Sequence, residues 1–210
     1  KGAPMLRKTA ALGLLLCSLL LVASPPAGFA QSLVRLTTWP VGTLTAFGLA
    51  VDAAGDVFVL GNFKGKSNFG GLDFDAGVAN DVFLVKLDKD GNHVWSHRFG
   101  EKNKAEEATS LALDGDKPVL LGGFTGNLDF GGGALASAGG FDVFLAKLDS
   151  AGCQIHASSY GAAMLESGED VSIDPSGNIV FAGSFTGTVD FGTGAITSAS
   201  TDAVVVKTKP

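Results

Sequence analysis

The chain has 210 residues, of which 46% are hydrophobic, and its 15 basic and 21 acidic side chains give a net charge of −6. This length is sufficient for a domain with a buried core, and the acidic balance disfavours nucleic acid and anionic lipid as partners. Only two cysteines are present, Cys17 and Cys153, so a framework of several disulfides is excluded.

The first part of the chain has the pattern of a secretory signal peptide. Arg7 and Lys8 precede an apolar run that is too short for a membrane-spanning helix, and a Gly-Phe-Ala cleavage pattern follows it. We expect residues 1–30 to be removed, of which residues 1–4 lie upstream of the natural start at Met5. Three basic residues leave with this segment, so the net charge falls from −6 to −9. The mature protein is then exported, to the periplasm, the cell surface or the exterior.

The remaining residues, 31–210, repeat one phrase three times, at about residues 48–108, 109–169 and 170–210. Each copy contains a Gly-x-Phe-x-Gly pattern, then a Phe-Gly pair, and later an aspartate followed by a lysine five positions on. Self-similarity at this period predicts a stack of similar units. The matched residues are Gly61, Gly122 and Gly183; Phe63, Phe124 and Phe185; Phe69, Phe130 and Phe191; Asp81, Asp142 and Asp202; Lys86, Lys147 and Lys207.

Each copy divides into four short runs rich in β-branched and aromatic residues, separated by Gly, Asp and Asn. In the second copy these runs are residues 109–114, 118–124, 142–149 and 153–161. The two middle runs are apolar on both faces, so a neighbouring layer must cover each face. We therefore predict an all-β fold of β-propeller type, with about three four-stranded antiparallel blades. The blades form an arc, a partial propeller or half of an oligomeric ring.

The repeated pattern D-x-x-G-[DN]-x-x-[VF]-x-G-x-F-x-G-x-x-x-F-G…D-x-[FV]-[LV]-x-K resembles the bacterial β-propeller repeat family of exported proteins, with repeats of the seven-bladed-propeller type. The resemblance covers residues 33–210. It implies propeller blades and brings little chemistry, because the family is characterised by architecture. NHL-type repeats, which are similar to "VDAAGDVFV" at residues 51–59, are the nearest alternative.

The repeated aromatic residues are expected to fill the space between blades. The leading glycine of each copy lies inside the second strand, where its missing side chain lets an aromatic ring pack, and the later glycines permit a positive φ. The phenylalanines expected to be buried are Phe63, Phe69, Phe83, Phe124, Phe130, Phe144, Phe185 and Phe191.

The two ends of the repeat region are in complementary phase. One extra run, residues 33–38, precedes the first repeat in the position of a fourth strand, and the final repeat stops after its third run, residues 202–208. These runs predict either a head-to-tail dimer, in which residues 33–38 of one copy pair with residues 202–208 of the other, or a fragment of a longer propeller.

Candidate binding residues lie on the long, glycine-rich connections between second and third strands and on the connections between repeats. Both kinds of connection share one end of the sheets, and loops on a rigid scaffold are favoured places for binding. Acidic residues crowded on such loops favour a solvated acidic rim, with a calcium site as the alternative. The candidates are Asp73, Asp75, Glu106, Glu107, Asp129, Glu166, Glu169 and Asp190.

Asp88, Asp90 and Asn92 resemble the beginning of a calcium loop, with oxygen ligands at alternate positions. The late glutamate of such a loop is missing, so the pattern favours a hairpin turn, with calcium as the alternative; we expect no cofactor. His156 takes the place of Trp95 in the preceding copy, which indicates a packing residue at the blade edge.

No nucleophile elbow, second mature cysteine or H-E-x-x-H motif is present. We therefore expect an exported, non-catalytic propeller that binds a protein or a glycan through its long-loop face and that either remains a monomer or forms homo-oligomers. One alternative is a fragment of a propeller enzyme, of glycan hydrolase or quinoprotein type, with its catalytic groups elsewhere. The other is a purely structural surface module.

Overall fold

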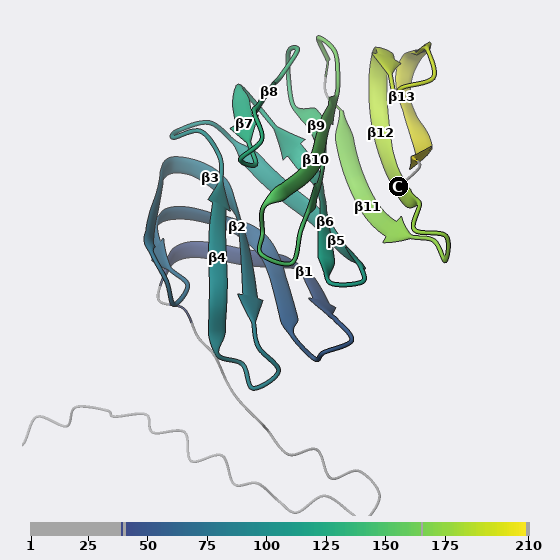
Figure 1. The fold of residues 1–210 in the computed structure, drawn as a ribbon. Helices are drawn as coiled ribbons and strands as arrows, with labels where there is room; N and C mark the ends of the chain where they lie inside the picture. Colours follow the sequence, from purple (N-terminus) through teal and green to yellow (C-terminus); the bar gives the residue numbers. More distant parts are fainter. Residues whose placement is uncertain (1–38, 40, 165, 209–210) are drawn as a thin grey trace, which may run out of the picture. The chain divides into compact units, whose positions relative to one another are not determined.

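The structure is a computed structural model that describes residues 39, 41–164 and 166–208. These residues are all-β, with no helix among them, and their strands form antiparallel sheets that we call blades 1, 2 and 3 (Figure 1). This confirms the predicted fold class. The predicted signal peptide and the extra run of residues 33–38 lie outside the described residues.

The strands of blades 1 and 2 follow the four runs of the first two sequence repeats, and those of blade 3 follow the three runs of the last repeat. Blade 1 contains β1 (Val41–Val51), β2 (Val57–Asn68), β3 (Asp73–Leu87) and β4 (His93–Phe99), and blade 2 contains β5 (Glu106–Asp114), β6 (Lys117–Phe124), β9 (Asp142–Leu148) and β10 (Gln154–Tyr160). Between β6 and β9 lies the small hairpin of β7 (Asn127–Asp129) and β8 (Ala134–Ala136). Blade 3 contains β11 (Ser167–Ile173), β12 (Ile179–Asp190) and β13 (Ala195–Thr208).

The connections between second and third strands differ from the long loops expected from the sequence. In blades 1 and 3 both strands continue into this region and pair up to a tight turn, as between Asn68 and Asp73. A bulge after Lys64 and another after Phe185 redirect the paired strands, and Gly65 and Gly187 there have φ of 78° and 84°. Glycine-rich sequence therefore marks a bent hairpin rather than an irregular loop.

The blades pack face to face through their repeated phenylalanines. All eight phenylalanines expected in the core are at most 9% exposed, as the sequence predicted. Phe124 and Phe144 of blade 2 share one cluster with Leu60 and Leu84 of blade 1. The side of a blade that carries its phenylalanines, here called its front face, thus covers the back face of the blade before it.

The leading glycine of the repeat is required by close packing. A Cβ on Gly122 would lie 2.1 Å from the backbone oxygen of Glu107 and 2.6 Å from the ring of Phe144. No side chain fits in that space. Gly61 and Phe83 are separated by the same number of residues and make the same contact in blade 1, where a Cβ on Gly61 would lie 2.7 Å from the ring of Phe83.

The back face of blade 3 is uncovered among the described residues. Val205 of β13 is 72% exposed, whereas the residues at the same register position are buried, Leu84 at 0% and Leu145 at 2%. The third blade therefore presents to solvent the face that the first two blades bury.

Candidate functional site

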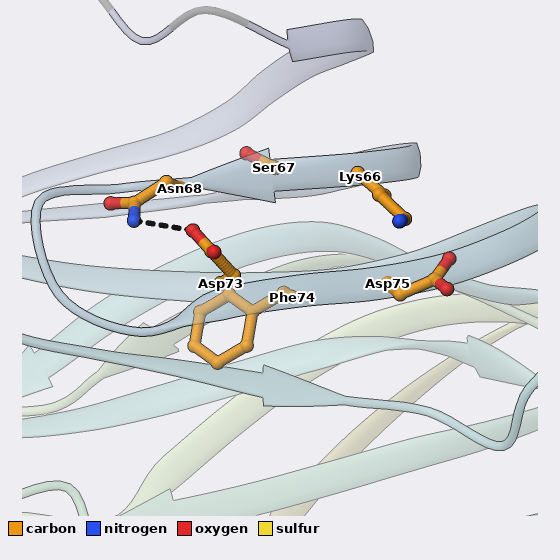
Figure 2. Close-up of a pocket in the computed structure, with 6 residues that line it drawn as sticks. All are labelled: Lys66, Ser67, Asn68, Asp73, Phe74 and Asp75. Carbon is orange, nitrogen blue, oxygen red and sulfur yellow. Dashed lines mark hydrogen bonds between the residues drawn. The ribbon is translucent and has the colours of Figure 1, made fainter.

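A pocket of about 460 Å³ lies at the turn between β2 and β3 (Figure 2). Its lining combines cationic, hydroxyl, amide, carboxylate and aromatic side chains from two paired strands. Two of the acidic candidates from the sequence belong to it. The lining residues are Lys66, Ser67, Asn68, Asp73, Phe74 and Asp75.

Hydrogen bonds fix three of the polar side chains of this pocket, Asn68, Asp73 and Asp75. The amide of Asn68 donates to Asp73 Oδ1 at 2.7 Å (Figure 2), and the backbone N–H of Gly77 donates to Asp75 Oδ1 at 3.0 Å. The Gly77 hydrogen bond, followed by that from Lys102, holds the pKa of Asp75 below its usual value, so this carboxylate remains charged in the pocket.

The ring of Phe74 gives the pocket an apolar wall. It is half-buried and lies 6.0 Å from the ring of Phe69 and 6.4 Å from that of Phe63, measured between centroids. The phenylalanine core of blade 1 therefore supports the ring from behind. Phe74 pairs with Ser67, so its side chain leaves the hairpin on the opposite face from those of Asp73 and Asp75 (Figure 2). The pocket therefore combines apolar surface from one face of the hairpin with fixed carboxylates and an amide from the other, which suits ligands that combine polar groups with an apolar face.

Asp129 and Asp190 have a different role, because each closes its own turn. Asp129 Oδ1 accepts the backbone N–H groups of Gly131 and Gly133 at 2.7 and 3.1 Å. Asp190 Oδ1 accepts the two equivalent glycine N–H groups at 2.7 and 3.0 Å, and these bonds lower its pKa. The two aspartates lie on separate blades and shape the backbone.

Glu106 is buried in the seam between blades 1 and 2. Its side chain is fully buried beside Asp81, whose Oδ2 accepts a hydrogen bond from Arg98 Nε. Burial, and then repulsion by Asp81, raises the pKa of Glu106 to about 8. Burial also raises the pKa of Asp81 to about 6, although Arg98 opposes the shift. The pair thus retains a proton, on Glu106, at neutral pH.

The seam between blades 2 and 3 repeats the pair as Asp142 and Glu166, which are 1% and 3% exposed. Each carboxyl accepts one backbone N–H, from Ala138 and from Ala162, and burial raises the pKa of both. Among the residues that the structure describes, no arginine accompanies them, because Ser159 stands at the register position of Arg98.

Glu107 and Glu169 lie on the surface. Glu107 Oε1 is 3.5 Å from the amide nitrogen of Asn80, and Glu169 Oε1 accepts the hydroxyl of Ser167 at 2.8 Å. Of the eight acidic candidates, the structure therefore brings Asp73 and Asp75 to one pocket. It disperses the others among turns, seams and surface.

The calcium-like sequence forms a hairpin turn. Asp88 Oδ1 accepts the backbone N–H groups of Asp90 and Asn92 at 2.9 and 2.7 Å, and Asp88 Oδ2 accepts the Asn92 amide at 2.9 Å. The same Asp-to-backbone pattern recurs at Asp149 and Asp174. Within residues 39, 41–164 and 166–208, no group of three or more His, Cys, Asp or Glu side chains could hold a metal ion.

The recurring lysines anchor the first hairpin of each blade to its third strand. Lys86 Nζ lies 3.0 Å from Asp56 Oδ2, Lys147 Nζ 2.8 Å from Asp114 Oδ2, and Lys207 Nζ 2.6 Å from Asp174 Oδ2. This ion pair explains why the lysine recurs in the sequence, because it holds the first hairpin against the third strand at one end of each sheet.

Sequence reasoning missed the partners of the buried glutamates. Asp81, Asp142 and Asp202 recur at one position of the repeat, which was the available signal. Their pairing with Glu106 and Glu166 depends on the packing of one blade onto the next. A one-dimensional pattern does not contain that distance.

Comparison with protein-family models finds no match, and comparison with curated proteins finds none either. In the part of the chain that the structure describes, no helix has the length and apolar character needed to cross a membrane. The function is therefore inferred from the geometry of the chain itself.

Proposed function

We propose that the protein is an exported, non-catalytic β-propeller scaffold that binds a protein or a glycan through the face carrying the β2–β3 turn. The pocket beside Phe74 carries this proposal, and it favours the glycan. Sugars present hydroxyl groups at their edges and apolar C–H groups on their faces. The carboxylates of Asp73 and Asp75 and the amide of Asn68 match the former, and the aromatic ring matches the latter.

The placement of the carboxyl groups supports a binding role over the alternative of a propeller glycan hydrolase. Such an enzyme uses two carboxyl groups about 5–9 Å apart at a site that the sugar can enter. Asp75, which shares the open pocket with Asp73, has a lowered pKa and so does not supply the protonated general acid that such an enzyme needs. The carboxyl pairs whose pKa is raised, Asp81 with Glu106 and Asp142 with Glu166, are buried in the seams between blades. A polysaccharide does not reach them without separating the sheets.

A glycan array probed with the purified chain tests the proposal. Asp73→Ala removes one carboxylate and the acceptor of the Asn68 amide, and we expect it to abolish binding to any glycan that the native chain retains. Asp116→Ala is the matched control, because this exposed acid lies in the β5–β6 turn, at the other end of its sheet. If the native chain retained no glycan, the protein-binding and structural alternatives would replace this proposal. Equal loss in both variants would argue for a nonspecific charge effect.

A further inference from the structure

A second pocket, of about 370 Å³, lies in the seam between blades 2 and 3. Leu145 and Ile179, on its two sides, are 2% and 4% exposed, whereas Ile155 is half exposed at the rim. The volume is within the range of small-molecule sites, about 300–1,000 Å³. Its lining residues are Leu145, Lys147, Ile155, His156, Tyr160, Ile179 and Thr208.

The equivalent place in the seam between blades 1 and 2 is filled by a tryptophan. The indole of Trp95 packs against the inter-blade cluster, 5.9 Å from the ring of Phe58, and its Nε1 donates to the backbone oxygen of Ser150 at 3.1 Å. Leu148 of blade 2 belongs to the same cluster and is fully buried. The indole and Leu148 thus occupy this part of the first seam.

Smaller residues stand at these positions in the second seam. His156 takes the place of Trp95, because each pairs with the repeated lysine of the third strand. Thr208 likewise takes the place of Leu148, and Val119 stands where blade 1 has a phenylalanine. The pocket is therefore the space that an indole and part of its apolar surroundings occupy one blade earlier.

The two nitrogen-bearing side chains of this pocket, Lys147 and His156, are already paired. Lys147 Nζ lies 2.8 Å from Asp114 Oδ2, and the ring of His156 shares a hydrogen bond of 2.8 Å with Ser158. The Tyr160 ring is fixed at 5.5 Å from the ring of Phe181. A ligand therefore does not need to supply a charge, and the surface open to it is largely aliphatic and aromatic.

The lysine beside the pocket adds a preference for an aromatic face. In blade 1 the equivalent Lys86 places Nζ 5.1 Å from the centroid of the Phe58 ring. In blade 2 that ring is replaced by Val119, so the ammonium of Lys147 lacks this aromatic neighbour. A bound aromatic ring would restore the cation–π contact.

We propose that the pocket between blades 2 and 3 binds a small, neutral aromatic molecule about the size of an indole ring. The ligand stacks in the seam against Tyr160, between Leu145 and Ile179, at the place in the repeat that Trp95 takes one blade earlier. This site is separate from the pocket at the β2–β3 turn, and its occupation does not depend on the function proposed for that pocket.

Titration of the purified chain with indole, followed by calorimetry, tests the proposal. His156→Trp should fill the pocket with the side chain that the first seam uses, and we expect it to weaken indole binding by at least about tenfold. Val94→Trp is the matched control, because it adds an indole at the equivalent of Ile155 on blade 1, outside the pocket. It should leave the affinity for indole unchanged.

Thr208→Leu gives a second variant, since it restores from the other wall the residue that closes the first seam. It should also weaken indole binding, and it does so even if His156→Trp fails to fold. Absence of binding to the native chain at millimolar indole would overturn the proposal. Undiminished binding to both pocket variants would overturn it as well, because indole would then occupy another surface, such as the exposed back face of blade 3.

Discussion

Single aromatic residues carry much of the packing between blades. Phe124 is fully buried and lies in the cluster that joins blade 2 to blade 1. Replacing it by alanine removes its contacts and leaves a cavity that rigid neighbouring sheets do not fill. We expect Phe124→Ala to lower the free energy of unfolding by about 3–5 kcal/mol, measured by urea denaturation. The exposed Phe47 provides the comparison, with an expected change within about 0.5 kcal/mol for Phe47→Ala.

The buried carboxyl pair predicts a dependence of stability on pH. The pKa of Glu106 is raised to about 8 and that of Asp81 to about 6, so in this range the folded state retains protons that the unfolded state has lost. The free energy of unfolding therefore falls as the pH rises from about 5 to about 8. Urea midpoints measured across this range should show the fall.

Glu106→Gln isolates this effect, because the amide has the shape of the protonated acid and does not ionise. We expect this variant to lose most of the pH dependence attributed to the first seam. Glu107→Gln changes the neighbouring exposed carboxyl and should leave the curve as in the native chain. Identical curves for the native chain and Glu106→Gln would mean that the pair is ionised in both folded and unfolded states.

At the scale of the element, the hairpin turns are closed by aspartate side chains. Both oxygens of Asp88 accept hydrogen bonds from residues of the same turn, and the equivalent turn at Asp149 uses the same backbone bonds. These bonds supply the polar contacts that a bound cation would otherwise provide. We expect EDTA to leave the melting temperature unchanged. A decrease of several degrees that calcium reverses would instead assign a structural ion to these turns.

The sequence predicts the strands better than it predicts what joins them. Alternating apolar runs and the repeat period identify the four strands of blade 2, because side-chain burial in a sheet follows a local pattern. The hairpins beyond Phe63 and Phe185 were expected as loops, since glycine normally weakens strand character. Their pairing depends on bulges at glycines with positive φ, which permit strands to bend and continue.

The candidate site was partly predictable for a related reason. Asp73 and Asp75 were identified as candidates because acidic residues cluster in one connection of the chain. Phe74 was not identified, because a phenylalanine between two aspartates has the pattern of another core residue. Its position at the surface of the blade 1 core, where it also lines the pocket, depends on three-dimensional packing.

At the scale of the whole molecule, one aromatic contact recurs at the front face of each blade. Phe99 and Tyr160 end the fourth strands of blades 1 and 2, and each contacts a phenylalanine of the next blade, at 4.8 and 5.7 Å. Trp39 makes the same contact with Phe69 of blade 1, at 5.6 Å. Trp39 thus takes, at the front face of blade 1, the place that Phe99 and Tyr160 take at the front faces of blades 2 and 3.

The uncovered back face of blade 3 leads to a prediction about association. Val205 exposes to solvent a position that the first two blades bury, and β13 forms an unpaired edge of its sheet in the described chain. Exposed apolar faces and open edges favour contacts between molecules. We expect the purified chain to self-associate head to tail, with the apparent mass from light scattering increasing with concentration.

Val205→Asp should shift the chain toward monomer, because association would bury an unpaired charge. Val78→Asp, at a position that is equally exposed but lies on blade 1 near the β2–β3 hairpin, should not. A native chain that remained monomeric at every concentration would refute the head-to-tail dimer, whereas loss of association in both variants would indicate that overall charge, and not this face, controls it.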